Sequence, residues 1–463
     1  MRRRPVCEPT ARTYARALPV VPVRARGLTV EGADGRRYLD CLSGAGALAL
    51  GHNHPVVLRA IRDALDSGAP LQVLDLATPV KDAFVTELLR TLPPGLAGHA
   101  RVRFCGPTGA EALTAAAGLV RAATGRTGVV AFTAGCHQAP DGLPGAPGGA
   151  CGVPVTCLPC PRHHRCPFGT GGERGAGRAA ERAESVLDGR EPGVPLPAGV
   201  ILEPVQAEDG VVPDPDAWAR RMRQITADRS IPLIADESHT GVGRTGAFWA
   251  VEHSGITPDV MVLSQAIGGS LPLAVVVHRA DLDVLPPGTD RDAFRGNQLA
   301  MAAGAATLAH VRENRLAQHA AVLGARMLAR LRELVARFPC VGDVRGRGLM
   351  IGIEMTDPDA DPDPDTKAAT TTTGRPASVP DGCARRPRPA AAVLAAALRR
   401  ECLRRGLIVG LGARHPGVVR LLPPLTITEE QAVAVLDRLA DAVEAVARHH
   451  PGRVPGHLPC RRS

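Results

Sequence analysis

Two carboxylates that follow a short apolar run are the strongest candidates for chemistry in this chain. The run begins at Leu233 and ends in Asp236 and Glu237, and a glycine-rich turn comes next. A second apolar run, Val260–Leu263, gives way to a polar and glycine-rich corner at 264–270. Open α/β sheets bind ligands beyond the carboxyl ends of their strands, so two buried strands that each end in polar residues predict a ligand site.

A turn of small residues offers a place for an anion. The apolar stretch Val102–Phe104 runs into Gly106–Ala110, and a long alanine-rich helical pattern follows. A helix that opens from such a turn presents free backbone N–H groups and the positive end of its dipole, which suits a phosphate group. Many strand-to-helix turns look alike, so this signal gains its weight from the surrounding motifs.

A cluster of sulfur and imidazole side chains raises the alternative of a zinc site. It contains Cys157, Cys160, His163, His164 and Cys166, which are ligand types that zinc prefers. Zinc needs ligand pairs that face each other, and nothing in this spacing fixes that geometry. We therefore expect no metal, and zinc stays the alternative interpretation.

The elements that must position these residues alternate between strand and helix. Apolar strands near 102–104, 199–205 and 233–236 are separated by helical patterns, which predicts a mostly parallel sheet with right-handed crossovers. One long helix is expected from Leu299 into the 330s. The fold class is therefore α/β, with a large doubly wound domain and a small α+β domain. The predicted units are an N-terminal segment that joins the small domain (1–50), the large domain (51–335), the small domain (336–448) with a disordered insertion (357–390), and a tail (449–463).

Composition excludes several classes of protein. The 463 residues carry a net charge of +9, but the arginines are spread along amphipathic helices, so no nucleic-acid partner is expected. The basic N-terminus lacks an apolar core and no run is long enough for a membrane span, so neither a secretory signal nor membrane insertion is expected. Twelve cysteines at irregular spacing suit reduced thiols, which predicts a cytoplasmic protein.

Several motifs together resemble the class III aminotransferases of fold type I. The stretches DESHTGVGRTG (236–246) and SQAIGG (264–269) are similar to the family patterns D-E-V-Q-x-G-x-G-R-T-G and S-K-x-[IL]-G-G-G. The turn GPTGAEA (106–112) resembles the diaminobutyrate–2-oxoglutarate aminotransferase branch, and EPVQAEDG (203–210) is also family-like. The resemblance covers about residues 8–355 and 391–447, so it implies the fold type I aminotransferase architecture for nearly the whole chain.

This resemblance implies a pyridoxal 5'-phosphate cofactor. In the family the residue at Asp236 faces the pyridine nitrogen, and the lysine that carries the cofactor as a Schiff base stands where this chain has Gln265. An amide is neither nucleophilic nor a useful base near neutral pH. The other implied cofactor positions are the phosphate turn (Thr108, Gly109, Ala110), the place of the stacking aromatic and its neighbour (Cys136, His137), the D-E-V-Q glutamine position (His239), and a threonine position that reaches the neighbouring subunit's phosphate (Ala293).

The resemblance also implies an amino acid and a 2-oxo acid as substrates. Arg420 corresponds to the arginine that grips the substrate carboxylate through a planar, bidentate fork. Glu208 resembles the glutamate that pairs with that arginine and frees it when an α-carboxylate must bind. Because the family site is completed across an interface, a homodimer is expected.

Three hypotheses about function follow. The first is a diaminobutyrate–2-oxoglutarate transaminase type that is impaired at Gln265. The second is an inactive pseudo-transaminase that serves as a subunit or ligand-binding protein. The third is an enzyme that uses pyridoxamine phosphate non-covalently, with His239 or His137 as the base. The two lysines of the chain, Lys81 and Lys367, lie in a helical pattern and in the insertion, so neither is expected to replace the missing amine.

Overall fold

A seven-stranded sheet forms the centre of the computed structural model, which describes residues 18–132, 152–162, 166–168, 172–188, 196–286, 293–360 and 388–449. The strand order is β4-β12-β11-β10-β7-β5-β6. In this sheet β12 runs antiparallel to both of its neighbours, and the other pairs are parallel. The predicted mostly parallel sheet is therefore confirmed. Its strands are β4 (Ala100–Phe104), β5 (Val129–Phe132), β6 (Val155–Leu158), β7 (Gly199–Leu202), β10 (Leu233–Asp236), β11 (Val260–Leu263) and β12 (Val275–Arg279).

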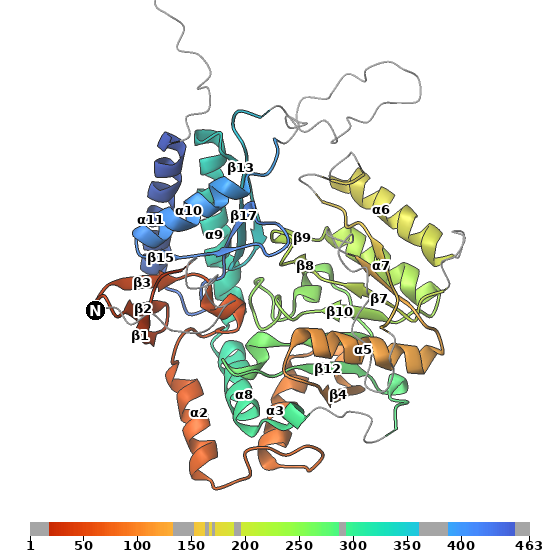
Figure 1. Cartoon of the computed structure of the whole chain (residues 1–463). Helices are drawn as coiled ribbons and strands as arrows, with labels where there is room; N and C mark the ends of the chain where they lie inside the picture. The colour runs from red at the N-terminus through yellow and green to blue at the C-terminus, as the bar shows by residue number, and fades with distance from the viewer. Residues whose placement is uncertain are drawn as a thin grey trace, which may run out of the picture.

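Helices cover both faces of this sheet because its strands are apolar on both sides (Figure 1). Along β10, Leu233 and Ala235 share a core cluster with Trp218 of helix α7, whereas Ile234 packs in the cluster of helix α5. Successive side chains of a strand point to opposite faces, so one four-residue strand serves two cores. The helices of this part are α2 (Pro55–Asp66), α3 (Pro79–Thr91), α4 (Pro94–Ala97), α5 (Gly109–Thr124), α6 (Gly172–Leu187), α7 (Asp216–Asp228) and α8 (Gln298–Glu313).

The single long helix expected from Leu299 is wrong, because two helices occupy that stretch. Helix α8 ends at Glu313, and α9 (Leu316–Arg337) begins after Arg315. Arg315 has a φ of +52°, a left-handed conformation that an α-helix cannot accommodate. The break lets α9 turn away from the large sheet and pack on β13.

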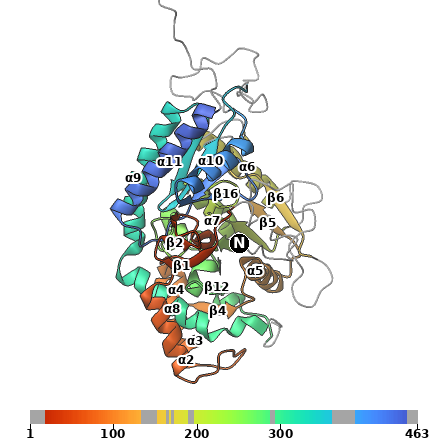
Figure 2. The same ribbon diagram turned by 60° about the vertical axis from the view of Figure 1, so that its left-hand side comes forward.

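Strands from both ends of the chain share a small sheet of order β1-β2-β3-β15. Strand β15 near the C-terminus pairs in parallel with β3, which itself forms a hairpin with β2. A further sheet of order β13-β14-β17-β16 lies under α9, α10 and α11, which group together in Figure 2. The elements are β1 (Pro22–Arg26), β2 (Thr29–Gly32), β3 (Arg37–Asp40), β13 (Val341–Arg347), β14 (Met350–Met355), β15 (Leu407–Ile408), β16 (Gly410–Leu411), β17 (Val418–Leu421), α10 (Ala392–Arg404) and α11 (Glu429–His449).

Short elements complete the frame around the sheet edge. They are η1 (Ser43–Gly46), β8 (Val205–Gln206), β9 (Val212–Pro213), η3 (Ala250–Ser254), η4 (Gln265–Gly268), η5 (Ala280–Leu282) and η6 (Ala293–Gly296). Most of the predicted insertion and tail lie outside the described residues. Where the insertion leaves and rejoins the fold, the N–H of Asp357 donates to the carbonyl of Pro389 at 3.1 Å. Among the helices that the structure describes, none is long and apolar enough to cross a membrane.

Candidate functional site

Three parallel strands end at the same edge of the large sheet and bring the predicted carboxylate together with other polar residues. Asp236 is the last residue of β10, Glu203 follows β7, and Ser264 follows β11. Leu202 pairs with Ala235, so the next step of the register sets Glu203 beside Asp236. This edge therefore places two carboxyl groups next to each other.

The two carboxyl groups are held differently. Asp236 Oδ1 accepts a hydrogen bond from the backbone N–H of Ser238 at 3.0 Å, which fixes the turn after β10. Burial raises the pKa of Glu203, and the negative charges of Asp236 and Asp209 raise it further. Glu203 belongs to the family-like stretch EPVQAEDG, which by itself assigns the residue no role. Its position at the end of a strand, like that of Asp236, is the feature of the sequence that could have indicated a place beside Asp236.

Gln265 and His239 contact each other across this edge. Gln265 Nε2 donates to His239 Nδ1 at 3.2 Å, while Gln265 Oε1 is buried and has no hydrogen-bond partner. A side chain at Gly46 of η1 would start 3.7 Å from that oxygen, so the N-terminal loop borders it. Burial lowers the pKa of His239 and the charges of Asp236 and Glu208 only partly oppose this, so the imidazole is held neutral.

The N-terminus of α5 lies beside the turn that follows β10. Thr108 forms a capping box with Glu111: Thr108 Oγ1 accepts from the backbone N–H of Glu111 at 3.2 Å, and Glu111 Oε2 accepts from the backbone N–H of Thr108 at 3.0 Å. Thr108 Oγ1 also donates to Glu111 Oε2 at 2.6 Å. Thr108 is thus occupied, which the pattern T-x-x-E could have predicted. Ser238 Oγ is buried without a partner, only 2.9 Å from where a side chain at Gly109 would begin. The N–H groups of Gly109 and Ala110 open the helix, where backbone donors have no intrahelical acceptor.

Arg420 and Glu208, the two predicted substrate residues, form an ion pair. Arg420 of β17 is 6% exposed, and its Nη1 donates to Glu208 Oε1 at 2.8 Å and to the carbonyl of Ala207 at 3.4 Å. Burial alone would raise the pKa of Glu208, but the charge and hydrogen bond of Arg420 outweigh burial and lower it. Arg420 Nε is buried and has no hydrogen-bond partner.

The remaining predicted positions are not brought to this edge by described contacts. Ala293 begins η6, and its carbonyl accepts a hydrogen bond from Gln72 Nε2. Cys136 and His137 lie outside the described residues.

The cysteine-rich segment forms a buried polar contact. Cys160 Sγ donates to Asp214 Oδ1 at 3.6 Å and accepts from Gln206 Nε2 at 3.1 Å. His163 and His164 lie outside the described residues. In the part of the chain that is described, no three or more His, Cys, Asp or Glu side chains are grouped so as to hold a metal ion.

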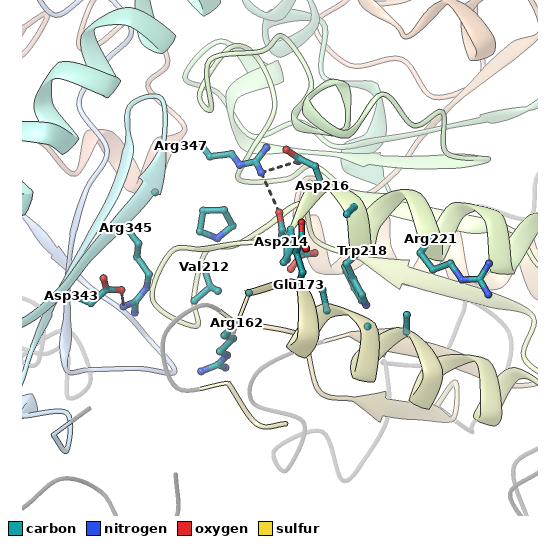
Figure 3. A pocket seen from close by; sticks show the side chains of 18 of the residues that line it. Arg162, Glu173, Val212, Asp214, Asp216, Trp218, Arg221, Asp343, Arg345 and Arg347 are labelled. Carbon is teal, nitrogen blue, oxygen red and sulfur yellow. Dashed lines mark hydrogen bonds and ion pairs between the residues drawn. The ribbon is translucent and has the colours of Figure 1, made fainter. Parts of the chain in front are cut away.

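A separate cleft of about 810 Å³ lies between α6, the start of α7 and β13 (Figure 3). Its walls are joined by arginines of β13: Arg347 Nη2 donates to Asp216 Oδ1 at 2.8 Å, and Arg345 Nε donates to the carbonyl of Gly210 at 2.9 Å. None of the predicted site residues lines this cleft. This cleft is therefore distinct from the predicted site.

Comparisons with known proteins agree with this geometry. The family described as Aminotransferase class-III matches residues 10–443. A diaminobutyrate–2-oxoglutarate aminotransferase of Rhizobium meliloti (strain 1021) is 46% identical, over 95% of this chain and 91% of that protein. A protein of the same name from Haemophilus influenzae is 41% identical, over 95% and 94%.

Solved structures give the same result. An (S)-enantioselective omega-transaminase from Thermomicrobium roseum superposes with a TM-score of 0.77 at 26% identity, over 96% of both chains. The class III aminotransferases are dependent on pyridoxal 5'-phosphate, act on amino acids and 2-oxo acids, and share the fold type I architecture. The family match and the two relatives span nearly the whole chain, and this protein therefore belongs to the class III aminotransferase family.

Proposed function

We propose that this protein recognises the substrates of a diaminobutyrate–2-oxoglutarate transaminase and binds its cofactor without a covalent bond, so that amino-group transfer is strongly impaired. The substrate class rests on the relatives of that name at 46% and 41% identity. It is supported by the pairing of Arg420 with Glu208, since a buried guanidinium whose Nε has no partner suits a ligand carboxylate.

The residues at the sheet edge fit a polar, phosphorylated ligand. Ser238 Oγ, Gln265 Oε1 and Arg420 Nε are all buried without a hydrogen-bond partner. Leaving a buried polar group unpaired costs about 1–3 kcal/mol, so a cluster of such atoms indicates a site for a ligand that pairs them. Asp236 would hold the ring nitrogen and the N-terminus of α5 the phosphate. When bound, pyridoxal 5'-phosphate supplies an electron sink for bonds at the amino acid's α-carbon.

The observation that carries the proposal is Gln265, since an amine is needed for covalent attachment and for proton transfer at that place. Lys81 does not supply one: it lies on α3, with Nζ 5.0 Å from the centre of the Phe104 ring. Lys367 lies outside the described residues.

One observation favours a second candidate, an enzyme that works on a non-covalently bound cofactor. His239 is a neutral imidazole that contacts Gln265 at 3.2 Å and is sensitive to the charge of Asp236. The proton-accepting nitrogen of this neutral imidazole is Nδ1, so His239 acts as a base when the hydrogen bond from Gln265 is broken. If this candidate holds, His239→Ala abolishes a residual turnover that the wild type shows; unchanged turnover in that variant contradicts it.

Restoring the amine tests the main proposal. We expect Gln265→Lys, incubated with pyridoxal 5'-phosphate and then borohydride, to carry a reduced adduct at position 265 by mass spectrometry, whereas the wild type carries none. Transfer between L-2,4-diaminobutyrate and 2-oxoglutarate should rise about 100-fold or more, since a positioned general base contributes roughly 10²–10⁴-fold. A wild-type adduct, or wild-type turnover equal to that of the variant, would overturn the proposal.

A further inference from the structure

We infer that Gln265 selects the amine-bearing form of the ligand: its Oε1 accepts an N–H from a primary amine, so the site binds pyridoxamine 5'-phosphate more tightly than pyridoxal 5'-phosphate. This inference rests on the proposed function, because it concerns the same site. It goes further in assigning a role to the residue that replaces the amine.

The hydrogen bond to His239 sets the orientation of the Gln265 side-chain amide. Its nitrogen Nε2 donates to His239 Nδ1 at 3.2 Å, so that ring nitrogen is the acceptor and the amide nitrogen is used. The other end of the amide, Oε1, is buried and has no partner. A buried carbonyl oxygen in this state gains most from a ligand that brings an N–H donor.

The backbone holds this oxygen in place. Gln265 has a φ of +54°, in the left-handed region that non-glycine residues rarely adopt. A conformation of this kind persists where the surroundings enforce it. Gly46, with a φ of +97°, approaches Oε1 from the N-terminal loop. A Cβ added to this glycine would lie 3.7 Å from Oε1. The glycine thereby leaves room beside the oxygen.

The two cofactor forms differ in the group they can offer to Oε1. The aldehyde of pyridoxal phosphate presents an oxygen without a proton, so two acceptors would oppose each other and both would stay unpaired. The aminomethyl group of pyridoxamine phosphate is a donor and carries a positive charge, and hydrogen bonds from a charged donor are the stronger kind. Asp236 adds negative charge near His239, whereas Glu208 and Arg420 form an ion pair whose charges offset each other, and Arg414 acts in the opposite sense to Asp236.

A primary amine could reach this oxygen from two sources: the aminomethyl group of pyridoxamine phosphate or an amine of a diamino acid substrate. Both share the same donor chemistry. The experiment therefore titrates the purified full chain, by calorimetry near pH 7, with pyridoxamine 5'-phosphate, pyridoxal 5'-phosphate and L-2,4-diaminobutyrate alone. We expect the first to bind at least about tenfold more tightly than the second, as one additional charge-assisted hydrogen bond provides.

Two variants assign the preference to the residue. Gln265→Leu removes the acceptor, and we expect the affinity ratio of the two cofactor forms to fall to about one. Gln265→Glu keeps an acceptor oxygen, so its ratio should equal or exceed that of the wild type, which distinguishes lost recognition from a damaged fold. Gln224→Leu, an exposed change on α7, is the matched control and should leave the ratio unchanged.

Each outcome has a distinct meaning. If neither cofactor form binds, the proposed function fails and the inference fails with it. If pyridoxal phosphate binds equally or more tightly, the inference alone is overturned. If only diaminobutyrate loses affinity in Gln265→Leu, the oxygen serves the substrate amine, and the assignment to pyridoxamine phosphate is overturned.

Discussion

Glu208 and Arg420 form an ion pair in which the arginine is largely buried. Arg420 is 6% exposed and would be a costly isolated cation, so Glu208 stabilises the protein. Glu208 accepts from Nη1 of the guanidinium, whereas Nε is buried without a partner.

A pH dependence follows from the lowered pKa of Glu208. The pKa of Glu208 in the folded protein lies below its value of about 4.3 in the unfolded chain. The ionised carboxylate therefore adds to the free energy of unfolding above that pH, and this stabilisation is lost as the pH falls through the folded pKa. We expect Glu208→Gln to lower the free energy of unfolding by about 1–3 kcal/mol at pH 7, and to flatten the fall in Tm below about pH 4.5.

Thermal unfolding of both proteins between pH 3 and 7 measures this effect. Glu444→Gln is a suitable control, because that exposed carboxylate pairs with Arg448 of α11, which is also exposed. Parallel Tm curves for Glu208→Gln and the wild type across the acid range would contradict the prediction.

Among the elements, η4 and α8 are packed back to back, and this contact positions Gln265. A side chain at Gly304 of α8 would begin 2.1 Å from the carbonyl of Ile267 in η4 and 2.9 Å from the ring of Phe84. A side chain at Gly269, whose φ is +56°, would begin 2.3 Å from the carbonyl oxygen of Ala303. The two glycines let helix and turn approach with their backbones nearly in contact.

Gly304→Ala should therefore displace η4. We expect a loss of about 1–3 kcal/mol in the free energy of unfolding, the usual cost of overpacking, together with weaker binding of pyridoxamine phosphate. Urea unfolding measures the first effect and calorimetry the second. In Gly177→Ala on α6, where nothing lies within 4 Å, the same change should stabilise the helix by about 0.5–1 kcal/mol. Identical urea midpoints for the wild type and Gly304→Ala would refute this account.

The same elements show what the sequence could and could not predict. The places of Asp236 and Gln265 at the ends of buried strands were predictable, because apolar runs lead up to them. The contact of Gln265 with His239 was not, since the direction of the side chain depends on a left-handed residue that no local pattern requires. The helix break at Arg315 was missed for a similar reason: apolar periodicity continues through it, and only the backbone shows the interruption.

At the scale of the whole molecule, several apolar side chains of the described residues are exposed close together in sequence and along a bridge. They are Leu71, Leu74, Leu76 and Phe294, of which the last two are each 69% exposed. A bridge between Gln72 and Asn297 joins this segment to η6, where Ala293 lies. Exposed apolar patches of this kind mark interaction sites, and we propose that a second copy of the chain covers them.

Light scattering after gel filtration tests this proposal. The wild type should elute with twice the mass of one chain, and Phe294→Asp should shift it toward the single chain, because a buried charge at an interface is costly. Val393→Asp on α10, where the valine is 74% exposed, should leave the mass unchanged. A wild-type protein of single-chain mass at micromolar concentration would rule the dimer out.

The arginine contacts across the separate cleft have a consequence for protein engineering. Arg420 stands on β17, which pairs with β14, and β14 pairs with β13, the strand whose Arg347 binds Asp216 at the start of α7. The sheet that carries Arg420 is thus joined to α7 by the contact between Arg347 and Asp216. Substitutions at Arg347 and Asp216 are therefore expected to move the sheet, and the guanidinium of Arg420 with it. Such substitutions would change the position of Arg420 without changing any side chain around it.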